Sequence, residues 1–122
     1  MSHILLVEDN ADMQKLLCEM LEWGGHSVMT GRTGQEALEA LSHAQALPEL
    51  IISDLNMPNM DGIQLVKKVR TESDKKFVPI ILVTTESQED KKQEGKAAGA
   101  TAWIVKPFQP DQLIGVVKKV LG

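Results

Sequence analysis

The chain has 122 residues, of which 43% are hydrophobic and 25% are charged, and its formal net charge is −4. Such a composition predicts one globular domain, and the acidic balance argues against nonspecific binding to nucleic acid, which needs clustered Lys and Arg. The single cysteine, Cys18, excludes an internal disulfide and a multi-cysteine metal site. No apolar run approaches the roughly 20 residues that span a bilayer, and the start lacks the charged leader of a signal peptide. We therefore expect no membrane contact and a cytoplasmic location.

The first predicted strand covers residues 3–7 and ends in two acids, Glu8 and Asp9. A helix is expected next, because Asn10 is a good N-cap and the apolar residues after it recur on one helical face. The Gly-Gly pair at 24–25 ends this helix. The residues predicted to face the core from it are Met13, Leu16, Leu17, Met20 and Leu21.

A weaker strand is predicted at residues 26–30, and the next helix begins in a capping box, Thr-Gly-Gln-Glu, at 33–36. The predicted core side of that helix consists of Ala37, Leu38, Leu41 and Ala44. Residues 50–52 then form an apolar run of β-formers, typical of a strand that is buried on both faces. Asp54 stands at the carboxyl end of this strand, which is where open α/β sheets place their chemistry.

Asp61 is a natural N-cap for a third helix. This helix is predicted to turn Ile63, Leu65, Val66 and Val69 inward and Lys67, Lys68 and Arg70 toward solvent. The most apolar run of the chain, at 79–83, predicts a fully buried strand that is followed at once by Thr84.

The fourth predicted helix differs from the others in having almost no large apolar residue. Ser87 can cap it, it extends over about 88–98, and Gly95 lowers its propensity further, so we expect it to be the least firmly anchored element. A fifth strand at 101–105 ends at Lys106. Proline at the first helical position opens a last helix, whose inward residues are Leu113, Ile114, Val117, Val120 and Leu121.

Five strand patterns thus alternate with five helix patterns over the whole chain. This alternation predicts a parallel sheet with helices on both faces, and right-handed crossovers favour a doubly wound arrangement. No repeat, low-complexity tract or interdomain linker interrupts the pattern. We therefore expect residues 1–122 to form a single α/β domain with no output domain attached.

Polar side chains follow four of the predicted strands at their carboxyl ends, namely Glu8, Asp9, Asp54, Thr84 and Lys106. Because parallel strands end at the same edge of a sheet, these groups should lie close together. Three neighbouring carboxylates repel one another unless a proton or a cation intervenes, and hard oxygen ligands with open positions suit Mg²⁺. Beside that metal, the Asp54 carboxylate could act as a nucleophile toward phosphorus, with the ammonium and the hydroxyl binding phosphoryl oxygens.

Four motifs surround these residues: Leu6-Val7-Glu8-Asp9, Ser53-Asp54-Leu55-Asn56-Met57-Pro58-Asn59-Met60-Asp61-Gly62, Val83-Thr84 and Val105-Lys106-Pro107-Phe108. In these motifs the chain resembles, over essentially its whole length, the receiver domains of bacterial two-component response regulators. The loop at 56–62 is most similar to that of the CheY-like chemotaxis regulators, which are stand-alone receivers. The resemblance implies a flavodoxin-like (βα)5 fold with strand order 2-1-3-4-5.

The resemblance also implies a role for each residue near the acidic cluster. Asp54 would accept a phosphoryl group from a histidine kinase. Asp9, Asp54 and the backbone carbonyl of Asn56 would bind Mg²⁺, and Glu8 would act through a water molecule. Thr84 would contact the phosphoryl group.

The end of the fifth predicted strand carries further implied features. Lys106 would also contact the phosphoryl group, and the bond between Lys106 and Pro107 would be a cis peptide, a form largely confined to X-Pro. Trp103 stands where receivers usually carry Tyr, Phe or His, an aromatic residue that turns inward when Thr84 moves. We expect Trp103 to switch similarly, the alternative being a ring that stays fixed. Thr85 replaces a small residue and is expected to narrow the approach of water.

Three enzyme or carrier classes compete with this reading. A flavodoxin-like electron carrier needs a phosphate-binding loop after the first strand, where Glu8 and Asp9 would repel phosphate. A phosphatase with an aspartyl-phosphate intermediate would carry a second acid two residues after the nucleophile, where this chain has Asn56. A P-loop enzyme is excluded because its Gly-rich Lys-Ser/Thr motif is missing. The sequence thus favours a phosphorylation-controlled binding module that is not an enzyme.

The predicted output surface extends from the weakly packed fourth helix to the fifth helix and includes Trp103. If the chemotaxis resemblance holds, the partners are a histidine kinase, a flagellar motor switch protein and a phosphatase, with the chain itself a monomer. The alternative is a receiver of another pathway, acting as a phosphorelay intermediate or a phosphate sink.

Overall fold

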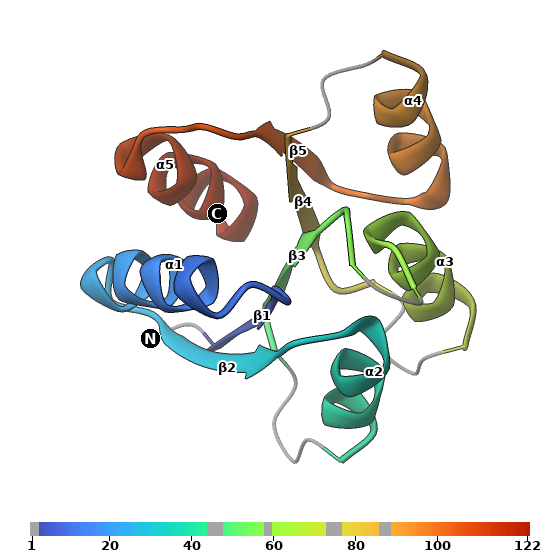
Figure 1. Ribbon diagram of the computed structural model, residues 1–122, viewed down its shortest axis with the longest axis horizontal. Coiled ribbons are helices and arrows are strands. Elements are labelled where there is room, and N and C mark those ends of the chain that lie inside the picture. Colours follow the sequence, from blue (N-terminus) through green and yellow to red (C-terminus); the bar gives the residue numbers. More distant parts are fainter. Residues whose placement is uncertain (1–2, 44–47, 58–59, 73–76, 86–88) are drawn as a thin grey trace.

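The computed structural model describes residues 3–43, 48–57, 60–72, 77–85 and 89–122. Within these ranges, strands and helices alternate along the chain as predicted (Figure 1). The strands are β1 (His3–Val7), β2 (Ser27–Gly31), β3 (Leu50–Asp54), β4 (Ile80–Thr84) and β5 (Ala102–Val105). The helices are α1 (Ala11–Trp23), α2 (Gly34–His43), α3 (Gly62–Glu72), α4 (Glu89–Ala98) and α5 (Pro110–Leu121).

The strands form one parallel sheet in the order β2-β1-β3-β4-β5, which confirms the expected doubly wound topology. Its register aligns the carboxyl ends of neighbouring strands. Val7, the last residue of β1, pairs with Gly31 of β2 and Ser53 of β3, and Thr84 of β4 pairs with Val105 of β5. Residues that follow these strands therefore leave the sheet at one common edge.

Helices cover both faces of the sheet, with α1 and α5 on one side and α2, α3 and α4 on the other (Figure 1). Side chains of β1 alternate between the two faces: Ile4 and Leu6 join a core cluster with α1 and α5, whereas Leu5 and Val7 join a cluster with α2 and α3. None of the described helices has both the length and the apolar character that crossing a bilayer requires.

The helices begin where the sequence predicts caps. Asn10, Thr33 and Asp61 each accept a hydrogen bond from the backbone N–H three residues later, at 2.9, 3.1 and 2.8 Å. These bonds satisfy N–H groups that have no partner inside the helix. Pro110 opens α5 as predicted. The proposed cap Ser87 and the predicted core residue Ala44 lie outside the described residues.

Two predictions about side-chain direction are wrong. Leu16 was expected to face the core, but it is 45% exposed, because this position of α1 lines an open depression beside the acidic residues. Arg70 was expected to face solvent, but its guanidinium is half-buried and donates hydrogen bonds to the carbonyl oxygens of Gly99 and Val78. Burial lowers the pKa of Arg70. Arg70 therefore ties the end of α3 to the residues that flank α4 and β4.

Gly95 has a packing role that the sequence did not reveal. It is the buried residue of α4, and a Cβ atom placed on it would lie 2.9 Å from Cζ3 of Trp103, closer than real Cβ contacts come. The missing side chain thus allows the indole ring to pack directly against the helix. Gly95 lowers intrinsic helix propensity, but it is also what lets α4 approach β5.

Candidate functional site

The predicted site residues leave the sheet at the edge where the strands end. Backbone hydrogen bonds extend the parallel ladder beyond the strands themselves: the N–H of Glu8 donates to the Gly31 carbonyl at 3.0 Å, and the N–H of Lys106 donates to the Thr84 carbonyl at 2.7 Å. The backbone positions of Glu8 and Lys106 are therefore determined by the sheet. This is a suitable support for a site that must hold its geometry.

Three carboxylates meet at this edge. Glu8, Asp9 and Asp54 each place one oxygen so that the three atoms lie within 4.8 Å of one another. Glu8 is buried, with 2% of its surface exposed, and Asp9 and Asp54 are half-buried. The cluster predicted from the strand ends is thus present as a compact group of oxygen ligands.

One cation faces these three acids within the described part of the chain. The Nζ atom of Lys106 lies 3.2 Å from Oε1 of Glu8 and 3.7 Å from Oδ1 of Asp54. A single ammonium leaves the ionised cluster with excess negative charge. Hard carboxylate oxygens, with no nitrogen or sulfur donor among them, are the ligands that Mg²⁺ prefers, so the three acids fit the expected ion.

The electrostatics of Glu8 show how crowded the cluster is. Burial raises the pKa of Glu8 above its ordinary value, and the charge of Asp54 raises it further. The N–H of Asn10, which donates to Oε2 at 3.2 Å, and the ammonium of Lys106 act in the opposite direction. Additional positive charge would favour the ionised form of this carboxylate.

The acids line one side of an open depression of about 400 Å³. Its lining residues are Glu8, Asp9, Asn10, Asp12, Met13, Leu16, Asp54, Thr85 and Lys106. Thr85 is exposed and lines this depression, whereas the Thr84 side chain is fully buried at the end of β4. A small charged group can therefore reach Asp54 from solvent through this depression.

Two further expectations concern the loops that follow β3 and β5. The peptide bond between Lys106 and Pro107 is cis, as expected. Asn56 is exposed in the loop after β3, and its role as a ligand through the backbone carbonyl stays a prediction. The loop is closed by a hydrogen bond from the N–H of Gly62 to the Leu55 carbonyl at 2.8 Å.

Trp103 lies on the same face of the sheet as Thr84. It pairs in register with Leu82, two residues before Thr84 on the neighbouring strand, and alternation places residues 82 and 84 on one face. The indole is half-buried and packs against the core cluster that contains Leu82. This placement allows a coupling between Thr84 and Trp103, and whether the ring switches stays a prediction.

Two residues that support the site were missed in the sequence. The side-chain amide of Gln14, on α1, donates to the carbonyls of Glu8 and Gly31, each at 3.2 Å, and so joins the ends of β1 and β2. Gly62 is the second, because a Cβ atom there would lie 2.6 Å from the Asp54 carbonyl oxygen. A polar residue such as Gln14 in a helix gives no indication of a contact with the sheet. Gly62 was noted only as part of the motif that follows Asp54, without its packing role.

The chain matches the family described as response regulator receiver domain over residues 4–118. It is 39% identical over 120 residues to the chemotaxis protein CheY1 of Helicobacter pylori strain ATCC 700392 / 26695, covering 98% of this chain and 96% of that protein. It is also 31% identical over 118 residues to the phosphate regulon transcriptional regulatory protein PhoB of Escherichia coli, covering 97% of this chain but 51% of PhoB.

Solved structures that resemble this chain are also response regulators or receiver domains. The chemotaxis response regulator CheY4 of Vibrio cholerae superposes with a TM-score of 0.90 at 43% identity, covering 98% of both chains. The receiver domain of the sensor histidine kinase PA1611 from Pseudomonas aeruginosa, which has a magnesium ion coordinated in its active site cleft, superposes with a TM-score of 0.88 at 26% identity, covering 99% of this chain and 98% of that one.

Proposed function

Because the chain belongs to the response regulator receiver domain family, we propose that it is a signalling switch in which Asp54 accepts a phosphoryl group from a histidine kinase and thereby changes the binding of a partner. The observation that carries this proposal is the convergence of Glu8, Asp9, Asp54 and Lys106 at one edge of the sheet. Acidic residues that only end their strands and share no function would not need to converge with a lysine in this way.

In the proposed transfer, a carboxylate oxygen of Asp54 attacks the phosphorus atom of the phosphohistidine. A P–O bond forms while the P–N bond breaks, the imidazole leaves after taking up a proton, and Asp54 becomes an acyl phosphate. Lys106, whose ammonium lies 3.7 Å from Asp54, would offset the negative charge on the phosphoryl oxygens. The hydroxyl of Thr84 would donate a hydrogen bond to one of them.

The acidic cluster is the proposed site of Mg²⁺. Asp9, Asp54 and the backbone carbonyl of Asn56 would hold the ion, with Glu8 acting through a water molecule. The bound ion would supply positive charge that balances the carboxylates and the incoming phosphoryl oxygens. The magnesium in the cleft of the related PA1611 receiver domain supports this assignment.

Trp103 and α4 are the proposed means of transmitting phosphorylation. If the hydroxyl of Thr84 turns toward the phosphoryl group, it vacates space on the face that it shares with Trp103. The indole can then shift, and with it α4, because Gly95 is in contact with the ring. The output surface would comprise α4, β5 and α5.

Thr85 is proposed to set the lifetime of the phosphorylated state. It lies on the rim of the depression that exposes Asp54, where it would hinder the approach of a hydrolytic water. Replacing Thr85 with Ala should therefore speed the loss of the phosphoryl group, as measured by following the phosphorylated fraction with time. An unchanged decay rate would remove this role.

The similarity to CheY1 over nearly the whole of both chains supports a stand-alone receiver in chemotaxis. In that case a histidine kinase is the phosphodonor, the flagellar motor switch is the target, a phosphatase resets the signal, and the chain acts as a cytoplasmic monomer that is not itself an enzyme. A receiver of another pathway, serving as a phosphorelay intermediate or phosphate sink, is the alternative. Asn56 in place of a second acid argues against a phosphatase.

The proposal is tested by incubating the protein with acetyl phosphate and Mg²⁺. We expect one phosphoryl group per chain, detected by intact mass, and none in the Asp54→Asn variant. Asp61→Asn is the matched control, because it makes the same chemical change at a helix cap outside the acidic cluster. Sustained hydrolysis of external phosphoesters would instead favour a phosphatase, and labelling that survives in Asp54→Asn would contradict the assignment.

A further inference from the structure

The side chain of Gln14 closes the end of the sheet between β1 and β2. Gln14 lies in the first turn of α1 and is half-buried. Its side-chain nitrogen donates to the carbonyl oxygens of Glu8 and Gly31, each at 3.2 Å. An amide NH₂ group has two N–H bonds, and both are used here. The amide thus adds one connection to the parallel ladder beyond the last residues of the two strands.

These hydrogen bonds fix the turn that carries two of the three acids. Asp9 stands between Glu8 and Asn10, and Gln14 contacts the backbone on both sides of it. Before Asp9, the Glu8 carbonyl accepts from the Gln14 side chain, and the Glu8 N–H donates to Gly31 at 3.0 Å. After Asp9, the Asn10 carbonyl accepts from the Gln14 N–H at 2.9 Å. The Asn10 N–H in turn donates to Oε2 of Glu8 at 3.2 Å.

The charges around this turn explain why it needs to be held. Oxygen atoms of Glu8, Asp9 and Asp54 lie within 4.8 Å of one another. Lys106 pairs with Glu8 and Asp54, whereas Asp9 is in no ion pair among the residues that the structure describes. Repulsion from the other two carboxylates therefore pushes Asp9 away from the cluster. A backbone that is fixed on both sides of Asp9 opposes this displacement before any cation binds.

We propose that Gln14 is a positioning residue for the Mg²⁺ site. By holding the Glu8 carbonyl, its amide keeps the Asp9 carboxylate where it would bind the ion. The inference rests on the proposed function and adds a residue that acts through the backbone of the acidic turn, without touching the ion or the phosphoryl group. A merely structural bridge between β1 and β2 would stabilise the fold but would leave the affinity for Mg²⁺ unchanged.

The test is a titration of the metal-free protein with MgCl₂, followed through the chemical shifts of the backbone amides. Gln14→Met keeps the length of the side chain but has no N–H to donate. Its half-saturating Mg²⁺ concentration should rise about tenfold, as is typical when a group that supports a metal ligand is removed. Gln35→Met, at an exposed position of α2, is the matched control and should stay within about twofold of the wild type.

A second variant and a second measurement separate positioning from stability. Gln14→Asn keeps the amide but is too short to reach both carbonyls, so its loss should be similar, and it replaces Gln14→Met if that variant fails to fold. Leu113→Ala removes a buried side chain of α5 and lowers stability elsewhere, so it should shift the half-saturating Mg²⁺ concentration by less than about twofold. In labelling of Gln14→Met by acetyl phosphate, that concentration should rise about tenfold, with the rate at saturating Mg²⁺ within about twofold.

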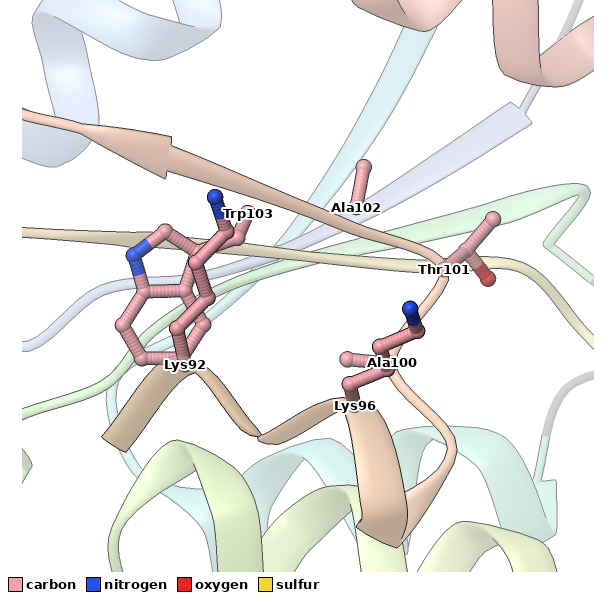
Figure 2. Close-up of a pocket in the computed structure, with 6 residues that line it drawn as sticks. All are labelled: Lys92, Lys96, Ala100, Thr101, Ala102 and Trp103. Carbon is pink, nitrogen blue, oxygen red and sulfur yellow. The ribbon is translucent and has the colours of Figure 1, made fainter. Parts of the chain in front are cut away.

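Trp103 provides a probe of the opposite face of the sheet. Figure 2 shows its indole beside Lys92 and Lys96 of α4, and the ring packs on the core cluster that contains residues of α2 and α3. In a Trp23→Phe background, the emission of Trp103 should be the same with and without the Gln14→Met substitution. An unchanged emission would show that the effect is confined to the turn after β1.

Several outcomes would overturn the inference. They are an unchanged half-saturating Mg²⁺ concentration in the Gln14 variants, an equal shift in Gln35→Met or Leu113→Ala, and a shift of Trp103 emission that accompanies the loss of affinity. Labelling of wild-type Asp54 separates this inference from the proposed function. If Asp54 is labelled and the Gln14 variants bind Mg²⁺ normally, only the role of Gln14 falls. If Asp54 is not labelled, the proposed function falls, and the MgCl₂ titration still decides whether Gln14 positions the acids.

Discussion

α4 is held on the sheet differently from the two helices of the opposite face. On one face, α1 and α5 bury branched side chains in the core, with Leu17, Leu21, Leu113 and Val117 almost fully removed from solvent. On the other face, the buried residue of α4 is Gly95. Apolar burial is the main source of packing energy, so α1 and α5 are firmly anchored, whereas α4 buries little apolar surface of its own.

The contacts that do hold α4 are specific. Arg70 donates two hydrogen bonds to the carbonyl of Gly99, just beyond the end of the helix, and Gly95 rests against Trp103. One face thus supports the acidic cluster through α1, whereas the other carries α4, a helix whose displacement exposes little apolar surface. An element of this kind is suited to reporting a change at Thr84.

The largest effect is expected from weakening the anchored face. Leu113→Ala removes a fully buried side chain and should lower the free energy of unfolding by about 2–5 kcal/mol, because a cavity remains. Leu16→Ala makes the same change at a leucine that is 45% exposed, and its effect should stay within about 1 kcal/mol. Urea unfolding measures both, and equal losses would refute the difference in anchoring.

Next in size is the release of α4 at its end. Arg70→Met leaves the carbonyls of Gly99 and Val78 without their guanidinium partner, which should cost about 1–3 kcal/mol. Hydrogen exchange should become faster at the carboxyl end of α4 and remain unchanged in α5. Lys67→Met, at an exposed position of the same helix, is the control, and similar exchange in both variants would show that Arg70 does not hold α4.

A smaller effect is expected where α4 meets β5. Gly95→Ala gains about 1 kcal/mol of helix propensity but forces a Cβ against Trp103, and overpacking typically costs about 1–3 kcal/mol; we expect a net loss of about 1 kcal/mol. Fluorescence of Trp103, read in a Trp23→Phe background, should shift. Gly115→Ala is the control, since its added Cβ would meet no described atom within 4 Å apart from those of adjacent residues and the backbone of its own helix. Stabilisation by both substitutions would show that the ring tolerates a side chain.

The smallest effect is a pH dependence at the acidic cluster. Burial and the charge of Asp54 raise the pKa of Glu8 above its ordinary value of 4.5, although Lys106 opposes the rise. The folded protein therefore holds this proton more tightly than the unfolded chain. The resulting stability is fully present below about pH 4.5 and is lost as the pH rises through the folded pKa.

The glutamine of the Glu8→Gln variant cannot ionise. In the presence of a chelator, the free energy of unfolding of this variant should therefore increase relative to that of the wild type as the pH rises above 4.5. Urea unfolding at a series of pH values measures the slope, which reports the net shift in the pKa of Glu8, including the opposing effect of Lys106. Parallel curves for the two proteins would show that burial of Glu8 has no electrostatic consequence.

Local patterns were sufficient for most of the fold. The apolar runs and the caps at Asn10, Thr33 and Asp61 predicted where strands and helices lie, because each depends on neighbours within one turn or one strand. The alternation of elements then left few topologies, and the observed strand order is the one that the family motifs implied. The acidic cluster was predictable for the same reason, since parallel strands end at one edge.

The sequence by itself thus determined the order of the elements and the chemistry at the sheet edge. Only the tertiary structure decided which side chains meet across elements. Arg70 reads as a solvent-facing helix residue until the Gly99 carbonyl is placed beside it, and Gly95 reads as a weak helix residue until Trp103 is packed against it. These contacts join residues distant in the chain, and their distances follow from how the helices dock on the sheet, which no local pattern encodes.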